Sequence, residues 1–327
     1  MRSACSIVAD IGGTNARFAT LINNVAPLEC VQILPCANFV RIDAAIRHYL
    51  HTQVEPLGLK LDAICLAVAG HVNGDHMKIL NNHWEFSQQY LRRQFQCDLY
   101  VINDFTAQAM SLHTLSEEHL RWLRSPTMAH RQHKTKAVIG PGTGLGVAAL
   151  TPNGEVIDSE AGHCTVAAVT VEQQEIVNYL RRYYPRVSVE RLVSGPGLAN
   201  IHAALTALSG TEIKIQPEQI TAGAQQGDSQ CLATINEFNI MLGTVCGDLA
   251  LALGAVGGVY LSGGVLKKMG PLFDPAVFLQ HFDAKGRFQQ YCRNIPIALM
   301  TVDYPGLIGA AHYLSQRLTE KPIYECQ

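Results

Sequence analysis

Apolar positions along this chain fall into short runs, and two of these runs, far apart in the sequence, are built alike. Residues 8–21 have the layout of an apolar strand, a Gly/Thr turn and a second apolar strand, and residues 137–150 repeat it. A further turn signal follows each copy, Asn-Asn at 23–24 and Pro-Asn-Gly at 152–154. The repeat predicts two similarly built lobes.

Between the two copies lie two more apolar runs, residues 61–70 and 99–103, which end in Gly and in Asn. Continuous apolar runs of this length are typical of parallel strands that helices cover on both faces. Apolar residues at helical spacing predict helices between the copies and also after Thr165, where the chain becomes mostly helical. These helices are expected at 42–50, 86–95, 171–183, 197–208, 235–253 and 306–318. The predicted fold class is therefore α/β.

Two segments stand outside this pattern. Residues 249–266 carry no charged side chain, but they contain five glycines and follow Asp248. They fit a buried helix, a glycine turn and a short core strand better than a membrane span. Residues 127–136 are polar and are predicted to form a solvated loop between the lobes. We therefore expect no membrane segment.

The composition of the chain excludes some classes of function. The chain has 327 residues, of which 48% are hydrophobic and 16% charged, so it can bury a large core and is not expected to be disordered. The net charge of −2 gives no overall attraction for nucleic acid or an anionic membrane, which favours a small-molecule ligand. The ten cysteines include no Cys-x-x-Cys pair, and the N-terminal residues are too poor in apolar side chains for a signal peptide. We expect a cytoplasmic protein with reduced thiols.

The two Gly/Thr turns are the first candidates for chemistry. Glycine lets backbone N–H groups approach an anion, and a threonine hydroxyl adds a donor, so two facing turns could hold a polyphosphate. The alternative is that each is merely a tight hairpin turn. Neither is a P-loop, since no lysine directly follows a glycine, and residues 140–146 lack the spacing of a dinucleotide-binding motif. The candidate residues are Gly12, Gly13, Thr14 and Asn15 in the first turn and Gly142, Thr143 and Gly144 in the second.

Two carboxylates follow predicted strands. Asp10 comes just before the first turn and could hold Mg²⁺ through water beside the phosphates of a nucleotide, or it could simply form the turn. Asp104 follows the run 99–103 and precedes a helix-like segment at 105–110. Ligands bind beyond the carboxyl ends of parallel strands, so Asp104 could accept the proton of an attacking hydroxyl. An ordinary helix N-cap is the alternative for Asp104.

A third group of residues suits a polyol. Glu160 and His163, followed at a distance by Glu190, can accept and donate hydrogen bonds to several hydroxyls together with Asn103. A Glu-x-x-His spacing with no nearby third ligand is weak evidence for a metal. Asn81 could also contact a sugar hydroxyl. Sugar binding is therefore the better interpretation.

Other positions each have two interpretations. Trp84 is predicted to be core or a pocket wall rather than a catalytic residue. Gly263 and Gly264 could let the backbone approach a flat base, or they could allow tight helix packing. Arg17 could form an ion pair, at the surface or between the lobes, or it could contact a phosphate.

Taken together, these motifs resemble the bacterial-type glucokinases, which belong to the superfamily of sugar kinases, actin and Hsp70. The match runs in order over nearly the whole chain. It rests on Asp10-Ile-Gly-Gly-Thr-Asn-Ala-Arg17, Asn103-Asp-Phe-Thr-Ala107, Gly140-Pro-Gly-Thr-Gly-Leu-Gly146, Glu160-Ala-Gly-His163, Glu190-Arg-Leu-Val-Ser-Gly-Pro-Gly197 and Leu261-Ser-Gly-Gly264.

The resemblance implies a two-lobed, actin-like (ribonuclease H-like) ATPase fold with the ligand cleft between the lobes. Residues 1–104 with 306–327 would form the small α/β domain, and residues 105–305 the large one. It also implies transfer of the γ-phosphate of ATP, with Mg²⁺, to the 6-hydroxyl of glucose, which gives glucose 6-phosphate in the first step of glycolysis. A homodimer is expected from the same similarity.

The resemblance also implies roles for the candidate residues. Asp104 would be the catalytic base, and Asp10 the carboxylate on the Mg²⁺ side. The sugar ligands would be Asn81, Asn103, Asp104, Glu160, His163 and Glu190. The nucleotide would lie against Gly12, Gly13, Thr14, Asn15, Gly142, Thr143 and Gly144, with Gly263 and Gly264 bordering the adenosine.

Two departures from the family pattern leave the substrate open. The family's Glu-Gly-Gly-His has Ala161 in place of its first glycine here. If that position requires a positive φ, alanine costs about 1 kcal/mol or more and the geometry of Glu160 and His163 shifts. Residues 164–168 also lack the acidic and proline residues often found there. A kinase for another hexose or amino sugar, or a non-catalytic sugar sensor, therefore stays an alternative.

Overall fold

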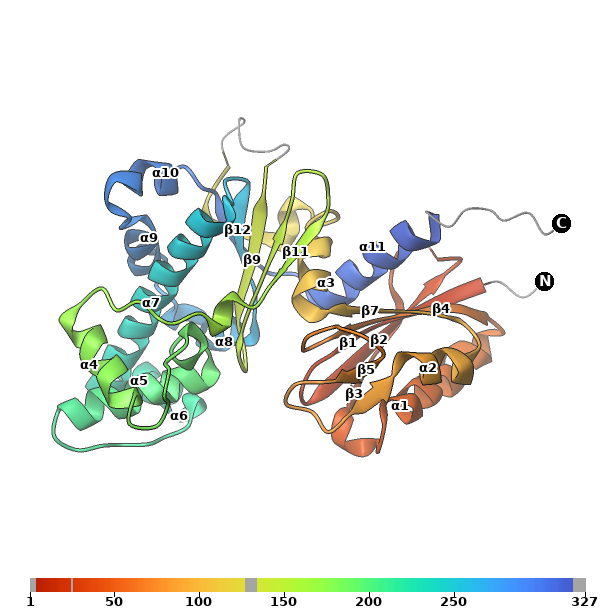
Figure 1. Ribbon diagram of the computed structural model, residues 1–327, viewed down its shortest axis with the longest axis horizontal. Helices are drawn as coiled ribbons and strands as arrows, with labels where there is room; N and C mark the ends of the chain where they lie inside the picture. Colours follow the sequence, from red (N-terminus) through yellow and green to blue (C-terminus); the bar gives the residue numbers. More distant parts are fainter. Residues whose placement is uncertain (1–3, 25, 127–133, 320–327) are drawn as a thin grey trace. The chain divides into compact units, whose positions relative to one another are not determined.

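The computed structural model describes residues 4–24, 26–126 and 134–319 (Figure 1). The chain divides into two compact units, residues 1–117 with 302–327 (unit 1) and residues 118–301 (unit 2). Both predicted boundaries, at 104/105 and 305/306, fall inside unit 1 in this division. The reason is that helix α3 (Asp104–Ser111) packs against helix α11 (Pro305–Thr319) and against the sheet of unit 1.

Unit 1 is built on a five-stranded sheet with the order β3-β2-β1-β4-β7. Its strands are β1 (Ala4–Ile11), β2 (Asn15–Ile22), β3 (Glu29–Pro35), β4 (Lys60–Val68) and β7 (Asp98–Asn103). β2 pairs antiparallel with β1 and β3, whereas β1, β4 and β7 are mutually parallel. The strand-turn-strand predicted at 8–21 and the strands predicted at 61–70 and 99–103 are confirmed.

The side chains of β1 alternate between two hydrophobic cores, one on each face of the sheet. The odd-numbered residues from Cys5 to Ile11 pack with α1 (Ile42–Tyr49) and α2 (Gln88–Phe95). Val8 belongs to the other core, with α3 and α11. Because successive strand residues face opposite ways, Asp10 lies on the same face of β1 as Val8. The alternation thus directs Asp10 towards the face that α3 and α11 cover.

The helices of unit 1 follow the predictions with one correction. A short hairpin of β5 (His76–Lys78) and β6 (Glu85–Ser87) precedes α2, and Phe86 pairs with Met77 in it. The helix predicted at 86–95 therefore begins only at Gln88, where the Ser87 hydroxyl accepts a hydrogen bond from the Tyr90 N–H. The helices predicted at 42–50, 105–110 and 306–318 correspond to α1, α3 and α11.

Unit 2 contains a six-stranded sheet with the order β11-β10-β9-β12-β13-β8. Its strands are β8 (Leu120–Arg124), β9 (Lys136–Pro141), β10 (Leu145–Leu150), β11 (Val156–Ser159), β12 (Gly258–Leu261) and β13 (Ile297–Met300). β9 pairs antiparallel with β10 and parallel with β12, just as β1 pairs antiparallel with β2 and parallel with β4. The long-range repeat in the sequence is therefore a repeat of strand pairing.

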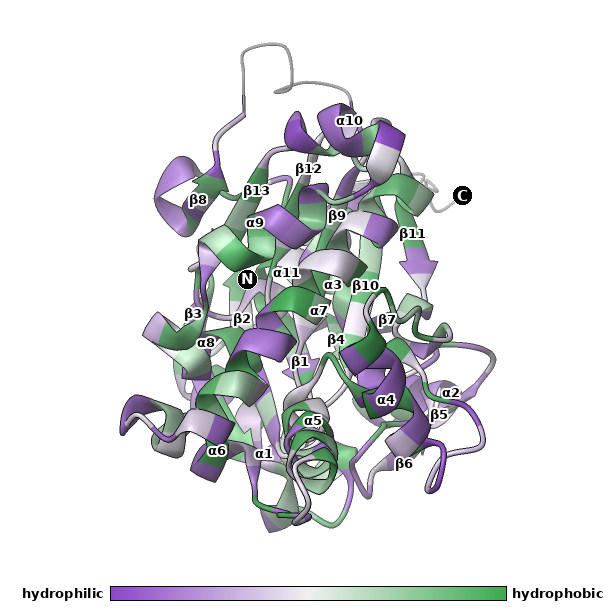
Figure 2. Cartoon of the chain, turned by 90° about the vertical axis from the view of Figure 1, so that its left-hand side faces the viewer, coloured by the Kyte–Doolittle hydropathy of each residue, from purple (hydrophilic) through white to green (hydrophobic). Residues whose placement is uncertain are grey.

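The helices of unit 2 share one large core with this sheet. They are α4 (Val171–Leu180), α5 (Gly195–Leu208), α6 (Pro217–Gln225), α7 (Ser229–Leu253), α8 (Gly264–Met269), α9 (Pro275–Asp283) and α10 (Gln289–Arg293). Figure 2 shows hydrophobic residues concentrated in α5 and the strands, and hydrophilic residues on α6 and α10. The predicted helices at 171–183, 197–208 and 235–253 are α4, α5 and most of α7. No expectation covered α6, α8, α9 and α10, which are all shorter than ten residues.

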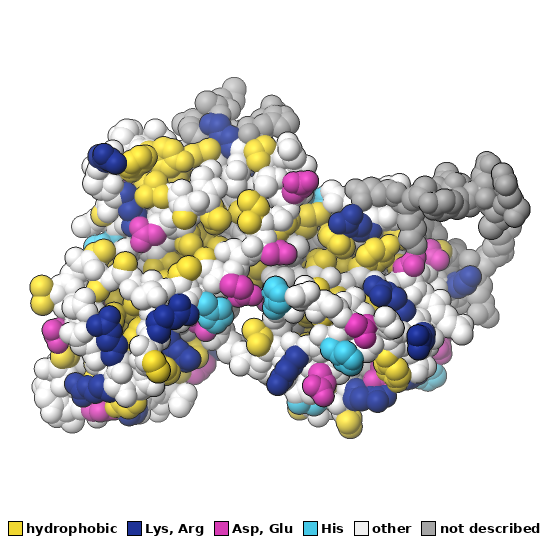
Figure 3. Space-filling view, in the orientation of Figure 1, with side chains coloured by type: hydrophobic (Ala, Val, Ile, Leu, Met, Phe, Trp, Pro, Cys, Tyr) yellow, Lys and Arg dark blue, Asp and Glu magenta, His cyan; other side chains and the backbone are white. Residues whose placement is uncertain are grey.

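The uncharged segment 249–266 has the structure predicted for it. α7 ends at Leu253, Gly254 caps it with a φ of 60°, and β12 follows as a buried strand. Within the described ranges, no helix is long and apolar enough to cross a membrane. Of the loop predicted at 127–136, residues 127–133 lie outside the described residues, and Lys136 already belongs to β9. On the face shown in Figure 3, basic and acidic side chains of each unit are interspersed.

One buried carboxylate in unit 2, that of Glu237, has a raised pKa. Glu237 of α7 is 5% exposed, and its Oε1 accepts a hydrogen bond of 2.8 Å from Nε2 of Gln173 in α4. Burial raises the pKa of Glu237 from its ordinary value of 4.5 to about 7, and the nearby carboxylate of Glu172 acts in the same direction. Folding therefore takes up a proton at this side chain between about pH 4.5 and pH 7.

This proton uptake predicts a pH-dependent stability. Because the pKa of Glu237 is raised in the folded state, the buried side chain is stable when protonated and destabilises the fold when it ionises. The free energy of unfolding therefore falls as the pH rises from 4.5 through 7. Glu237→Gln stays neutral and keeps an acceptor for Gln173. We expect the substitution to leave unfolding unchanged near pH 4.5 and to stabilise the protein at pH 8 by up to about 3 kcal/mol. Urea unfolding at both pH values, with the exposed Glu175→Gln as control, measures this; equal effects at both pH values would contradict it.

Candidate active site

The first Gly/Thr turn joins β1 to β2 and is held by a neighbouring loop. The Gly12 carbonyl accepts a hydrogen bond of 2.9 Å from the Asn82 side chain, and the Cys36 N–H donates to the Thr14 carbonyl at 2.8 Å. A Cβ on Gly13 would lie 2.8 Å from the Asn81 carbonyl oxygen, so only glycine fits there. The turn and this loop line a pocket of about 460 Å³. Its lining residues are Gly13, Thr14, Cys36, Ala37, Asn81, Asn82 and His83.

Trp84, which follows this loop, belongs to the core. It is 1% exposed, and its indole N–H donates to the Phe39 carbonyl at 2.9 Å. Of the two interpretations of Trp84, core rather than pocket wall is therefore confirmed.

Asp10 lies at the carboxyl end of β1, opposite Arg17 in the antiparallel register. Its Oδ2 forms an ion pair of 3.3 Å with the Arg17 guanidinium, whose centre lies 5.9 Å from the ring of Tyr304. Burial raises the pKa of Asp10, and Arg17 opposes that rise. A Cβ on Gly306 would lie 2.8 Å from Cγ of Asp10, so the first turn of α11 approaches the carboxylate closely. For Arg17, the structure shows an ion pair within unit 1.

Asp104 is the first residue of α3, and its neighbour caps the helix. Oδ1 of Asn103 accepts hydrogen bonds from the N–H groups of Phe105 (2.8 Å) and Thr106 (3.2 Å), and its Nδ2 donates to the Gly70 carbonyl at 3.0 Å. The alternative of Asp104 as the N-cap is therefore wrong, because Asn103 holds that position. The Asp104 carboxylate also accepts from the Phe105 N–H at 3.0 Å.

The sheet brings Asp10 and Asp104 to one edge. Asp10 pairs with Ala67 of β4, and Ala67 pairs with Ile102 of β7, two residues before Asp104. These three strands are parallel, so their carboxyl ends share an edge, and adjacent strands are spaced by about 4.8 Å. β1 and β7 are therefore separated by roughly 10 Å, with β4 between them. Two acids distant in sequence thus belong to one region of unit 1.

The second Gly/Thr turn, in unit 2, joins β9 to β10 and is supported on two sides. The Gly142 carbonyl accepts a hydrogen bond of 2.8 Å from the N–H of Gly195, the first residue of α5. Gly263 has a φ of 97°, and a Cβ there would overlap the Pro141 carbonyl oxygen. The Glu190 carboxylate lies against Gly144 and accepts from the Leu145 N–H at 3.0 Å.

The predicted sugar segment of unit 2 is attached to the same region. Glu160 precedes a short 3₁₀-helix and His163 is its last residue. Oε2 of Glu160 lies 3.8 Å from Nε2 of His163, and both side chains are more than half exposed. Thr165 and Ser188 form a β-bridge, and the Val189 N–H donates to the Cys164 carbonyl at 2.9 Å. This bridge holds Glu190 near the segment that follows His163.

Ala161 is compatible with this geometry. It lies in a short 3₁₀-helix and is not among the residues with positive φ, so the strain considered for it does not arise. Its neighbour Gly162 is the position that demands glycine, because a Cβ there would overlap the Leu145 carbonyl oxygen.

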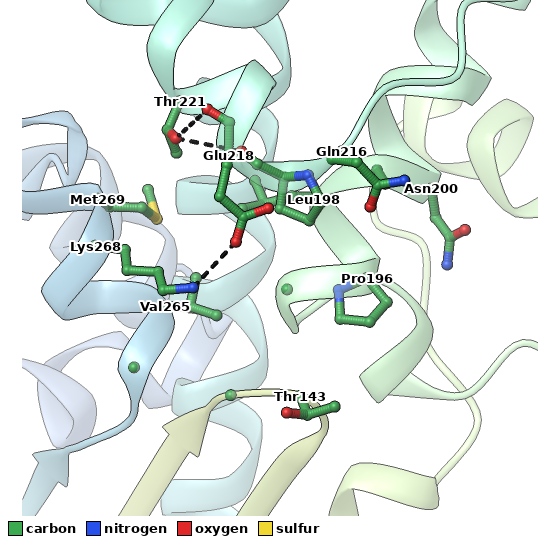
Figure 4. Close-up of a pocket in the computed structure, with 15 residues that line it drawn as sticks. Thr143, Pro196, Leu198, Asn200, Gln216, Glu218, Thr221, Val265, Lys268 and Met269 are labelled. Carbon is green, nitrogen blue, oxygen red and sulfur yellow. Dashed lines mark hydrogen bonds and ion pairs between the residues drawn. The ribbon is translucent and has the colours of Figure 1, made fainter. Parts of the chain in front are cut away.

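A pocket of about 610 Å³ opens beside the second turn (Figure 4). The turn itself, the first residues of α5 and α8, and polar side chains of α5, α6 and α8 line it. Gly142, Thr143 and Gly264 are part of this lining, whereas Gly263 packs against Pro141. Sequence reasoning missed Asn200, Gln216, Glu218, Thr221 and Lys268, which carry no motif and come from α5, from α6 with its N-cap, and from α8.

The residues predicted to bind ligands are thus divided between the two units. Unit 1 holds Asp10, Gly12, Gly13, Thr14, Asn15, Asn81, Asn103 and Asp104. Unit 2 holds Gly142, Thr143, Gly144, Glu160, His163, Glu190, Gly263 and Gly264. Among the described residues, no group of three or more His, Cys, Asp or Glu side chains could hold a metal ion.

Comparison with known proteins decides the family. The sequence profile of the glucokinase family matches residues 7–317. The chain belongs to the glucokinase family. A glucokinase of Saccharophagus degradans is 40% identical over 95% of this chain and 98% of its own length. A bifunctional protein of Burkholderia pseudomallei is 38% identical over 96% of this chain, which spans 49% of that longer protein.

A solved structure gives the same answer for the fold. The glucokinase of an Antarctic psychrotroph superimposes with a TM-score of 0.84 and 37% identity, covering 95% of this chain and 99% of that one. The predicted resemblance and the predicted actin-like α/β fold are confirmed.

The close approach at Gly162 predicts opposite outcomes for two neighbouring substitutions. Gly162→Ala must displace the Leu145 carbonyl, so we expect a loss of about 1–3 kcal/mol in the free energy of unfolding. Ala161→Gly restores the family's glycine without any clash, and we expect a change below about 1 kcal/mol. Denaturant unfolding of both variants measures this difference. Equal losses would show that the approach at Gly162 does not limit this segment.

Proposed function

We propose that this chain transfers the γ-phosphoryl group of ATP to the 6-hydroxyl of glucose, with Asp104 as the base. The observation that supports this mechanism is the placement of Asp10 and Asp104 at one edge of a parallel sheet, beside the Gly12–Thr14 turn, in a chain of the glucokinase family. Ligands of open α/β sheets bind beyond this edge.

In the proposed reaction, the sugar O6 attacks the γ-phosphorus of ATP. The new O6–P bond forms as the bond from the γ-phosphorus to the bridging oxygen breaks, and ADP leaves with that electron pair. The O6 proton passes to the Asp104 carboxylate. Because phosphoryl transfer depends mainly on positioning and on neutralising charge, a base fixed at the start of a helix suits this task.

Mg²⁺ fits the residues around Asp10. Mg²⁺ in kinases is usually held by one or two carboxylates together with waters and substrate phosphates, and Asp10 supplies one carboxylate beside the Gly12–Thr14 turn. We propose that Asp10 holds Mg²⁺ through water. The ion would neutralise charge on the transferring phosphate. Arg17, paired with Asp10 at 3.3 Å, opposes the rise that burial causes in the pKa of this carboxylate and helps to hold it in place.

The sugar ligands proposed are Asn81, Asn103, Glu160, His163 and Glu190. Asn103 uses one amide hydrogen for Gly70, and an amide nitrogen carries two, so a second donor remains for a hydroxyl. Glu190 accepts from Leu145 through Oε2 and can accept again through its other oxygen. Since Ala161 adopts its conformation without a positive φ, the strain that would displace Glu160 and His163 does not arise.

The proposed reaction also requires that water be excluded as a competing acceptor. A cleft between the lobes, a homodimer, a glycolytic role and a cytoplasmic location stay predictions.

The assignment of Asp104 predicts a defect in turnover. Asp104→Asn keeps an acceptor for the Phe105 N–H but cannot take up a proton, so kcat should fall at least about a hundredfold. Calorimetry should show glucose binding within a few-fold of the original. Asp62→Asn, at the opposite end of β4, serves as control. Near-normal turnover in Asp104→Asn would exclude Asp104 as the base.

The assignment of glucose predicts a substrate order. In a coupled assay with ATP, we expect a higher kcat/KM for glucose than for mannose, fructose or N-acetylglucosamine. Preference for another of these sugars would replace glucose as the substrate. Glucose binding without formation of any product would instead support a non-catalytic sensor.

A further inference from the structure

The pocket beside the second turn of unit 2 has two chemically different ends. At one end lie Gly142 and Thr143, with the N-terminus of α5 directly behind them through the Gly195–Gly142 hydrogen bond of 2.8 Å. Backbone N–H groups and a helix N-terminus favour an anion at this end. At the other end lie the polar side chains of Asn200, Gln216 and Thr221 (Figure 4).

An ion pair crosses the pocket between these ends. Glu218, in the first turn of α6, directs its carboxylate into the pocket, and Lys268 reaches it from α8 with 3.0 Å between Nζ and Oε1 (Figure 4). The two side chains are 67% and 71% exposed. An ion pair so exposed contributes little to folding, typically below about 1 kcal/mol. Folding therefore depends little on this ion pair, and the Glu218 carboxylate is accessible to a ligand in the pocket.

The chemistry of the pocket suits a nucleoside. A volume of about 610 Å³ lies within the usual range for small-ligand sites. Leu198, Val265 and Met269 give it an apolar wall against which a flat base can pack. In Rossmann-type sites an Asp or Glu carboxylate accepts a hydrogen bond from a ribose hydroxyl, and Glu218 offers the same group between the Gly142–Gly144 turn and the apolar wall.

We propose that Glu218 accepts hydrogen bonds from the ribose hydroxyls of the donor nucleotide and makes this chain selective for ribonucleotides. Lys268 pairs with this carboxylate in the structure but is not required for the contact with the ribose. The proposal rests on the proposed function, because it requires the donor's phosphates to lie at the Gly142–Gly144 turn.

Calorimetric binding of ADP, 2′-deoxyADP and 3′-deoxyADP tests this assignment. A hydrogen bond to a charged acceptor changes affinity by about tenfold or more. The original chain should therefore bind at least one deoxy analogue about tenfold more weakly than ADP. In Glu218→Ala, ADP should lose about tenfold, the deoxy analogue should lose little, and their ratio should approach one.

Two further variants separate the ribose contact from other effects. Glu172→Ala removes a carboxylate from the same position in the first turn of α4, outside the pocket, and should leave all three affinities unchanged. Lys268→Ala removes the partner but keeps the carboxylate, so discrimination against the deoxy analogue should persist. Thermal unfolding of each variant checks that the fold is intact.

Two outcomes overturn the assignment. Unchanged discrimination in Glu218→Ala, or an equal loss of affinity for ADP and the deoxy analogue, would mean that Glu218 does not contact the ribose. In that case, glucose phosphorylation by the original chain would still support the proposed function. Absence of ADP binding to the original chain would contradict the donor site itself, and the proposed function with it.

Discussion

The parallel register of β1, β4 and β7 is the constraint on which the rest of unit 1 depends. Asp10, Ala67 and Ile102 are register partners across the three strands. The segments that follow β1 and β7 therefore begin at the same edge of the sheet. A shift of one residue in β1 would turn Asp10 to the other face of the sheet, into the core that contains Ile7 and Ile11. Burial of that core therefore fixes where the carboxylate points.

Unit 2 achieves a comparable result through close backbone contacts. Gly144 leaves room for the Glu190 carboxylate, and Gly162 leaves room for the Leu145 carbonyl, so the second turn, Glu190 and the segment from Glu160 to His163 assemble around the start of β10. Side chains at either glycine would separate these groups. Close contacts at these two glycines thus have in unit 2 the role that the parallel register has in unit 1.

Two carboxylate–cation pairs show how burial changes what an ion pair does in this protein. Asp10 is largely buried, and its pKa is raised by burial against the opposing effect of Arg17, so its ionisation depends on that partner. Glu218 is exposed beside Lys268, where water already stabilises the charge and the pair contributes little to folding. The buried pair is suited to holding a charge in place, and the exposed pair to exchanging partners when a ligand arrives.

The sequence by itself determined the strands β1, β2, β4, β7, β9, β10 and β12, the two turns and most of the long helices, because alternation, helical spacing and Gly/Thr chemistry are local signals. It also placed Asp10, Asp104, Glu160 and Glu190 among the residues of interest. It did not predict β3, β5, β6, β8, β11 and β13. Only the tertiary structure decided that Asn103 caps α3, that Ala161 is unstrained, and that the demand for glycine falls on Gly162. The lining of the unit 2 pocket by Asn200, Gln216, Glu218 and Lys268 was equally beyond the sequence. Apart from the local cap at Asn103, these outcomes depend on which atoms of distant segments approach one another. Packing of the whole core sets those distances.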